Sequence, residues 1–447
     1  QKERVFENAF LEYGCMKSMT APLNRKMYFL TDPIEDRAKD WLDYKINYQA
    51  TFAAQLMYPM VDTYEVMPWP DRIYQGLYRI AGTDQKERIP RSYSTQMQTM
   101  VNTLNDIRTS DKKITGTQGI GVLMANSLMF QRFPNHNGYD DPQFSSFYGQ
   151  TLPLLKRGIP VELVHMENTP FKETFKGLHI LVMSYSNMKP MKPEYHNYLA
   201  DWVKKGGVLI YCGEDIDPYQ TVLEWWNTDG NEYKAPSEHL FEKMNLSRNP
   251  GEGTYRYGKG TVIVMREDPK HFVLKAGNDQ KYFETIASAY QKKQGIEIET
   301  KNSFIVERGP YTIAAVMDES VSKEPLTLSG LYIDLFDKDL PVLTSKQIQP
   351  GEQGYLYDLN KVSGKIKAKV LCGASRIYDE KVSKQSYSFV AKSPINTTNV
   401  SRVLLPCKPE KIRVNGKEEQ PEWDESSKTL LLSFENDPAG VNVSIEW

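Results

Sequence analysis

The sequence predicts a multidomain chain that combines α/β and all-β folds. Three stretches of its 447 residues differ in periodicity. Residues 1–113 have the order strand, loop, helix, strand, which is that of a β/α unit. Residues 114–295 hold short apolar runs between helical segments, and residues 296–447 show strand patterns with a period of two. These patterns predict a β/α unit that belongs to a larger, barrel-like assembly, a doubly wound parallel sheet and a C-terminal antiparallel β-sandwich.

The first stretch contains two predicted strands. The apolar run 27–30 ends before Asp32 and Pro33, because proline disfavours helix in the residue that precedes it. A helix is expected over 44–57 and a second strand over 61–67. Two strands cannot close a sheet alone, so this stretch is expected to belong to a larger unit. A helix over 93–108 and a polar linker over 109–118 are expected to follow.

The middle stretch gives the clearest prediction. A short, nearly continuous apolar run is typical of a parallel strand that is buried on both faces. Four such runs alternate with helical segments, which favours an open, doubly wound sheet. The runs lie at 120–124, 161–164, 179–183 and 208–211, and the helices at 142–156 and 193–204. No glycine-rich phosphate motif follows the first run, so a nucleotide site is disfavoured.

The last stretch is predicted to be all-β. Residues 365–370 alternate strictly between lysine and apolar side chains, as expected of a half-buried strand. Residues 311–316 and 429–434 are two further β-prone runs. Asn415 and Gly416 form a hairpin-type turn signal. An antiparallel sandwich, preceded by a smaller sheet, fits this pattern best.

Composition limits the classes of function. The chain has 55 lysines and arginines against 57 aspartates and glutamates, a net charge of −2. This balance gives no support for bulk nucleic-acid or membrane binding, and no apolar run is long enough to predict a membrane span. Six histidines and four cysteines show no metal-binding spacing, so no metal or other cofactor is implied.

The chain begins with QKERVFENAF, without an initiator Met or an apolar leader, so a mature product or a fragment is expected and the compartment is undetermined. The 27 tyrosines and 7 tryptophans fit either aromatic cores or sugar-stacking surfaces.

The acidic loop after the first strand is the strongest chemical signal. Asp32, Glu35 and Asp36 lie within five residues of one another. Barrel enzymes place catalytic carboxylates at the carboxyl ends of strands. A glycosidase needs two such groups, one to protonate the leaving oxygen and one to attack or to activate water. A solvated acidic loop is the alternative interpretation.

The second strand carries further candidates. Glu65 lies in an apolar strand, where a charge needs a partner or a shifted pKa. Trp69 stands between two prolines at the strand end, where an indole is well placed to stack on a sugar ring. Arg72 is expected to pair with Asp71 or with a nearby carboxylate. A structural salt bridge and a packing role for Trp69 remain the alternative.

Three polar features follow strands of the middle stretch. Ser184 and Cys212 lie outside any Gly-x-Ser-x-Gly elbow, so a buried structural thiol is expected at Cys212. The acidic segment 214–217 is expected to be a solvated loop, with a ligand or cation site as the alternative. The polar loop 126–136 is expected at the surface or, in an oligomer, near a neighbouring active site.

In this order, the three stretches resemble the C-terminal two-thirds of clan A glycoside hydrolases of the bacterial β-galactosidase type. That family has a (β/α)8 catalytic barrel, a flavodoxin-like trimerisation domain and a small β-domain. The resemblance implies that residues 1–113 are the C-terminal part of the barrel, 114–295 the trimerisation-like domain and 296–447 a β-sandwich domain. It places barrel strand seven at 26–31 and strand eight at 61–69.

The resemblance implies a retaining glycosidase that acts on β-linked sugars, with an oligosaccharide or glycoside as substrate. Asp32 or Glu35 then occupies the nucleophile region, and Glu65 is a further catalytic candidate. The family has a glutamate at the end of strand seven, where this sequence has Asp32. No acid/base residue has a counterpart here, so this chain alone is expected to be inactive. The residues implied to contact the sugar are Trp69, Asp71, Arg72 and Trp41.

A homo-oligomer is also implied, with a trimer as one option, and neither nucleic acid nor membrane is an expected partner. Two other functions stay open. One is a non-catalytic carbohydrate-binding or oligomerisation module. The other is an amidotransferase-like enzyme built on the middle domain, which the missing nucleophile elbow disfavours.

Overall fold

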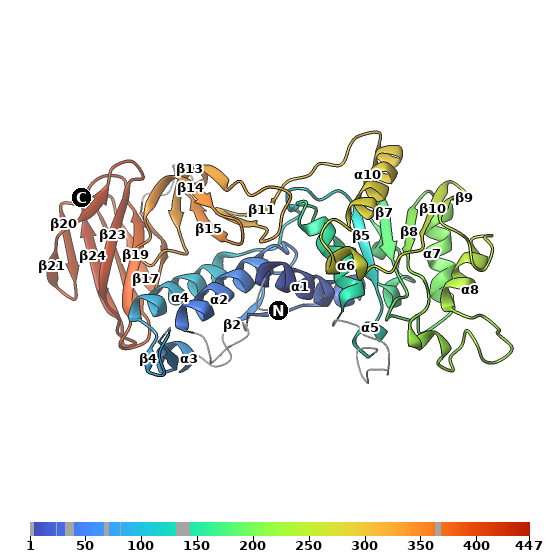
Figure 1. The fold of residues 1–447 in the computed structure, drawn as a ribbon. Coiled ribbons are helices and arrows are strands. Elements are labelled where there is room, and N and C mark those ends of the chain that lie inside the picture. Colours follow the sequence, from blue (N-terminus) through green and yellow to red (C-terminus); the bar gives the residue numbers. More distant parts are fainter. Residues whose placement is uncertain are drawn as a thin grey trace.

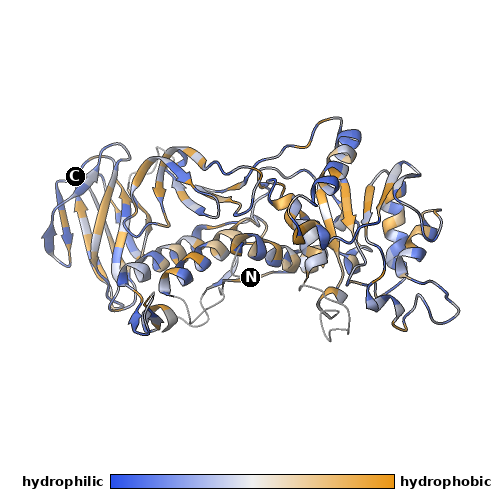
Figure 2. Ribbon diagram, viewed as in Figure 1, coloured by the Kyte–Doolittle hydropathy of each residue, from blue (hydrophilic) through white to orange (hydrophobic). Residues whose placement is uncertain are grey.

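The computed structural model describes residues 4–23, 25–31, 40–66, 71–80, 82–130, 144–362 and 368–447. Figure 1 shows an elongated molecule with antiparallel sheets at one end and a parallel sheet at the other. Helices of the N-terminal segment run between them. In Figure 2 the strands of the parallel sheet are its most apolar elements. Within the described ranges, no helix is long and apolar enough to cross a membrane.

The N-terminal segment contains a parallel β/α unit. Its elements are α1 (Val5–Thr20), η1 (Ala21–Leu23), β1 (Phe29–Thr31), α2 (Trp41–Leu56) and β2 (Tyr64–Val66). Helix α2 begins where the Asp40 carboxylate accepts a hydrogen bond from the Asp43 N–H, at 3.0 Å. The strands pair in parallel. The predicted order of strand, helix and strand is confirmed, but both strands are shorter than predicted, and the described residues show two strands rather than a barrel.

A small hairpin that the sequence did not predict follows this unit. It is preceded by a one-turn helix and followed by a longer one that lies beside α2 in Figure 1, with Tyr93 near its start against Trp41 at the start of α2. The elements are α3 (Asp71–Tyr74), β3 (Leu77–Arg79), β4 (Lys86–Arg88), α4 (Arg91–Thr103) and η2 (Leu104–Asp106). The predicted helix over 93–108 is thus confirmed as α4, which ends several residues earlier.

The middle sheet has six strands in the order β6-β5-β7-β8-β10-β9. All pair in parallel except β9, which pairs antiparallel with β10. The parallel strands, numbered along the chain, have the order 2-1-3-4-5, which is the flavodoxin-like arrangement. The four predicted runs are confirmed as strands. The strands are β5 (Ile120–Met124), β6 (Glu162–His165), β7 (Ile180–Met183), β8 (Val208–Cys212), β9 (Gly253–Tyr257) and β10 (Gly260–Met265).

Helices cover both faces of this sheet. The Tyr282 hydroxyl of α10 donates to the Gln150 carbonyl of α6 at 2.7 Å, so these two helices lie together. Helices α7 and α8 pack against each other elsewhere on the sheet. Both predicted helices are confirmed, as α6 and α7. The helices are α5 (Ser127–Phe130), α6 (Ser145–Leu155), α7 (Glu194–Lys204), α8 (Pro236–Lys243), α9 (His271–Leu274) and α10 (Gln280–Gln294), with 3-10 turns η3 (Met166–Asn168), η4 (Lys172–Phe175) and η5 (Pro218–Thr221).

A five-stranded antiparallel sheet follows and packs on α2. The ring of Phe52 in α2 lies 5.5 Å from that of Tyr355 and 6.3 Å from that of Phe336. The predicted run 311–316 is confirmed as β12. The strands, in spatial order, are β11 (Ser303–Arg308), β12 (Tyr311–Val316), β15 (Gln353–Asp358), β13 (Leu326–Asp334) and β14 (Val342–Ile348), and η6 (Leu359–Lys361) follows β15.

Two further antiparallel sheets face each other at the C-terminal end, as predicted for a sandwich. Buried side chains of both sheets, among them Tyr387 and Leu430, form one hydrophobic cluster. Asn415 (φ 50°) and Gly416 (φ 80°) make the predicted hairpin turn. Residues 365–367 of the predicted alternating strand lie outside the described residues. One sheet has β16 (Lys369–Gly373), β19 (Thr398–Leu404), β23 (Thr429–Glu435) and β22 (Glu422–Asp424), and the other β17 (Arg376–Val382), β18 (Ser386–Lys392), β24 (Val441–Glu446), β20 (Lys411–Val414) and β21 (Lys417–Glu419).

Candidate active site

The carboxyl ends of β1 and β2 define the candidate active site. The two strands are in register, with Thr31 opposite Val66. Parallel neighbours end at the same edge of a sheet, which is where barrel enzymes place their catalytic groups. Asp32 and Glu35 follow Thr31 in the sequence, and Trp69 follows Val66. All three lie outside the described residues.

The two faces of this small sheet differ in their surroundings. Phe29 is fully buried, with its ring centroid 4.7 Å from that of Tyr13 in α1 and 5.7 Å from that of Tyr58. This face therefore packs on the helices. Leu30 and Glu65 are opposite each other in the ladder and point to the other face, because successive strand residues alternate. Leu30 is 40% exposed, and Glu65 is exposed as well.

The sequence-based expectation that Glu65 is a buried charge is wrong for this chain. Its side chain is exposed, because the described part of the sheet has two strands and leaves this face open. The carboxylate is therefore not a buried charge in this chain. Its position on the face opposite the helices is the one that side chains of a barrel interior occupy.

The aromatic and charged candidates beside these strands are described in part. Trp41 opens α2 and is half-buried, with its indole 6.1 Å from the ring of Tyr93 in α4. This contact gives Trp41 a packing role between two helices. Asp71 and Arg72 open α3, and their side chains are outside the described part of the structure.

A buried arginine holds the segment that leads into β2, and sequence reasoning missed it. Arg308 of β11 is 2% exposed. Its guanidinium donates to the Val61 carbonyl at 2.6 Å, to the Tyr64 hydroxyl at 2.5 Å and to the Arg108 carbonyl at 3.2 Å. Burial raises the pKa of Tyr64 to about 12 against the opposing effect of Arg308. Tyr64 and Arg308 are 244 residues apart, so no local pattern in the sequence signals the contact.

Helix α1 attaches the β/α unit to the middle sheet. The Ser18 hydroxyl accepts a hydrogen bond from the His165 N–H at 2.9 Å, and its carbonyl accepts one from the Asn168 side chain at 2.7 Å. Lys17 forms an ion pair with Glu162 at 2.8 Å. These polar contacts fix α1 against β6, so the candidate site and the middle sheet form a continuous structure.

Cys212, one of the two nucleophile candidates in the middle sheet, has a structural role. Cys212 is fully buried at the end of β8, and burial raises the pKa of its thiol, which keeps it protonated at neutral pH. This confirms the expectation of a buried structural cysteine. Among the described residues, no group of three or more His, Cys, Asp or Glu side chains is placed to hold a metal ion.

The expectation that the acidic segment 214–217 is a solvated loop is wrong for two of its residues. Asp217 forms an ion pair with Lys189 at 2.9 Å, with side-chain exposures of 1% and 3%. Asp215 forms an ion pair with Arg266, also at 2.9 Å. The basic partners come from the loop after β7 and from the end of β10, which the local sequence does not reveal. Asn126 is exposed, as expected of its loop, while residues 132–136 are outside the described ranges.

Comparison with known proteins gives partial similarities. No family model matches the chain, and no curated protein matches it. Among solved structures, a β-galactosidase from Bacillus circulans sp. alkalophilus is 12% identical over 59% of this chain and 43% of its own, with a TM-score of 0.34. An exo-carrageenase of family GH42 from Bacteroides ovatus is 12% identical over 78% and 43%, with a TM-score of 0.35.

A rhamnosidase from Novosphingobium sp. PP1Y is 10% identical over 99% of this chain and 45% of its own, with a TM-score of 0.39. The chain spans less than half the length of each of these three structures. The structural neighbours are thus glycosidases, at low identity and partial coverage.

Proposed function

We propose that this chain is the C-terminal portion of a retaining glycoside hydrolase that acts on β-linked sugars. The observation that carries the proposal is the β1–α2–β2 unit. Its parallel strands end at one edge, and the sequence continues from them into Asp32 and Glu35 on one side and Trp69 on the other. Carboxylates at adjacent strand ends are what a glycosidase site requires, and an indole beside them can stack on a sugar ring.

The open face of this sheet supports the proposal that further β/α units complete a barrel. Leu30 is 40% exposed on that face, and Tyr28 and Leu42 nearby in the chain are 59% and 46% exposed. Within the described part of the chain, β1 and β2 each pair with one strand. A short sheet with open edges and an apolar face is a weak structure in water. Additional strands would bury Leu30 and surround Glu65.

The proposed chemistry needs two carboxyl groups about 5–5.5 Å apart. Asp32 or Glu35 would attack the anomeric carbon, and the leaving oxygen would take its proton from an acid outside this chain. Glu65 is the third candidate, since it points to the same face as Leu30. Trp69, Asp71, Arg72 and Trp41 are proposed to bind the sugar, although the contact with Tyr93 leaves Trp41 the weakest of the four.

The test uses the longest natural chain that contains these residues. Initial rates are measured on aryl β-galactosides, β-glucosides and β-mannosides for wild type, Asp32→Asn, Glu35→Gln and Glu65→Gln. Glu214→Gln, at an exposed acidic position in the loop after β8, is the matched control. Loss of about 10³-fold or more in kcat for one variant, with an active control, supports the assignment. Wild-type rates in all three variants would overturn it.

An assembly module is the second candidate, and a homo-oligomer, with a trimer as one option, is proposed with it. Ile216 and Leu223, in the loops that follow β8, are 71% and 82% exposed. Exposed apolar side chains on a loop anchored by the Asp217–Lys189 pair favour a contact surface. Light scattering over a concentration series tests the oligomer. A strict monomer would overturn the assembly module, and an inactive full-length chain would overturn the glycosidase.

A further inference from the structure

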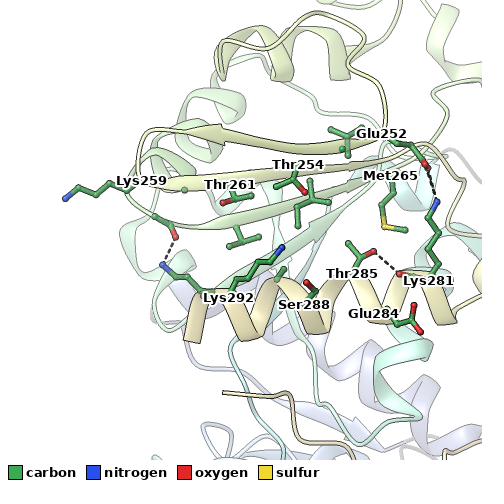
Figure 3. Close-up of a pocket in the computed structure, with 18 residues that line it drawn as sticks. Glu252, Thr254, Lys259, Thr261, Met265, Lys281, Glu284, Thr285, Ser288 and Lys292 are labelled. Atoms are coloured by element: carbon green, nitrogen blue, oxygen red, sulfur yellow. Dashed lines mark hydrogen bonds and ion pairs between the residues drawn. The ribbon is translucent and has the colours of Figure 1, made fainter. Parts of the chain in front are cut away.

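An open groove lies between α10 and the β10–β9 edge of the middle sheet, as Figure 3 shows. Its volume is about 570 Å³, within the range of about 300–1,000 Å³ that is typical of small-ligand sites. Val208, Ile263 and Met265 line it from the sheet, and Thr285 and Ser288 from the helix. The groove is remote in sequence from the β1 and β2 strand ends.

The groove exists because α10 covers only part of its face of the sheet. The buried side chains of α10, which include Tyr282 and Ile286, pack over β7 and β8. Strands β10 and β9 extend the sheet beyond the helix. Ile263 is therefore half-buried, and Thr254, its partner in the ladder, is exposed. Together they form a shelf that a ligand can reach from solvent.

Hydroxyl groups face one another across the groove. Figure 3 shows Thr254 and Thr261 on the strands opposite Ser288 on the helix. Hydroxyls both donate and accept hydrogen bonds, so they match a ligand that carries many hydroxyls of its own. No aromatic side chain is among the described residues that line the groove. Recognition would thus depend on hydrogen bonds and charge rather than on ring stacking.

The two ends of the groove differ in charge. Lys259 and Lys292 lie at one end in Figure 3, with the Lys259 side chain directed away from the groove, and Lys293 donates there to the Gly206 carbonyl at 2.6 Å. Lys281 lies at the other end and is paired with Glu252 at 3.2 Å. Lys259 and Lys292 are both exposed. The chain as a whole has a net charge of −2, so this basic end is a local feature.

We propose that this groove binds an acidic oligosaccharide. Its carboxylate or sulfate group would lie beside Lys292, at the end where Lys259 adds a second positive charge, and its hydroxyls would bond Thr254, Thr261 and Ser288. The choice of a saccharide rests on the proposed function. The site would hold a glycan without cleaving it, since catalysis is proposed at the strand ends of β1 and β2. An acidic peptide is the rival ligand that the test separates.

Calorimetric titration of the complete chain tests the proposal. The probes are a galacturonate tetrasaccharide, a sulfated tetrasaccharide, a neutral galactose tetrasaccharide and a tetraglutamate peptide. The variants are the double Lys259→Gln and Lys292→Gln, and Ser288→Trp, which fills the groove without a change of charge. A double Lys408→Gln and Lys417→Gln, at exposed lysines of the β-sandwich, is the charge-matched control.

The proposal expects one binding site per chain for at least one acidic saccharide. Its affinity should fall about tenfold or more in the groove double variant and in Ser288→Trp, and stay unchanged in the control. Equal binding of the neutral sugar or the peptide, an equal loss in the control, or no binding at all would overturn it. The readout is binding alone, so it is independent of the rates that test the proposed glycosidase.

Discussion

The Nδ1 atoms of His196 and His239 lie 2.8 Å apart, and the Tyr185 hydroxyl lies 2.5 Å from Nε2 of His196. Two imidazoles joined in this way need one donor and one acceptor, so the pair is intact when both rings are neutral. His196 is fully buried. Burial lowers the pKa of both histidines, with Lys243 contributing to each and Glu242 and Glu194 opposing it at His239.

This pair predicts that the protein becomes less stable in mild acid. Because the native pKa values lie below the ordinary histidine value of about 6.5, the unfolded chain binds more protons below that pH. The free energy of unfolding should therefore fall as the pH drops below about 6.5. The fluorescence of Trp225, whose ring lies 5.2 Å from that of His239, reports the change. His239→Gln should reduce the pH dependence and His271→Gln should not, and equal slopes in wild type and His239→Gln would contradict the account.

Arg308 predicts a large loss of stability on truncation. Arg308→Ala removes donors from buried carbonyls such as that of Val61, and should lower the free energy of unfolding by about 2–4 kcal/mol. Urea unfolding measures the loss. Arg413→Ala is the control, because its ion pair with Glu446 is exposed and should contribute about 1 kcal/mol or less. Similar losses for the two variants would show that the Arg308 contacts have no special role.

The buried pair of Lys189 and Asp217 predicts strong coupling in a double-mutant cycle. The Lys189 ammonium also donates to the Tyr185 carbonyl at 2.5 Å within the loop after β7, and its ion pair with Asp217 ties that loop to the loop after β8. Lys189→Met or Asp217→Leu alone leaves one charge buried, and each should cost about 3–5 kcal/mol. The double variant should cost less than the sum of the two. Additive losses would mean that the charges do not stabilise each other.

Gly149 of α6 predicts a steric effect. A Cβ at this position would lie 1.8 Å from the Pro269 carbonyl oxygen, so Gly149→Ala must displace backbone. We expect a loss of about 1–3 kcal/mol or more in thermal or urea unfolding. Gly251→Ala is the matched control, since a Cβ there would meet nothing within 4 Å. Equal stability of the two variants would contradict the close approach of α6 to the Pro269 carbonyl.

The fold was predictable where strands are buried on both faces, because such strands need nearly continuous apolar sequence. Every residue of strands β5, β7 and β8 is buried, and the apolar runs in the sequence predicted these strands. Strand β9 escaped prediction because its residues are exposed or half-buried, so it lacks an apolar run. Helix α10 was missed although its buried residues Tyr282, Ile286, Ala289 and Tyr290 have the spacing of an amphipathic helix.

The candidate site was predictable only as far as local signals reach. The strand ends that precede Asp32 and Trp69 follow from apolar runs and prolines in the sequence. The exposure of Glu65 depends on which strands stand beside β2, and the burial of Asp217 depends on Lys189, which lies in another loop. Both are tertiary properties that no local pattern encodes.

Covalent labelling of the nucleophile tests the central claim most directly. A retaining glycosidase forms a glycosyl–enzyme intermediate, which an activated fluorinated glycoside traps on the attacking carboxylate. The longest natural chain is inactivated with such a reagent, digested and analysed by mass spectrometry. The account predicts one label per chain, on the peptide that contains Asp32 and Glu35 or on the one that contains Glu65. A stoichiometric label elsewhere in the chain, or none from any β-glycoside reagent, would contradict it.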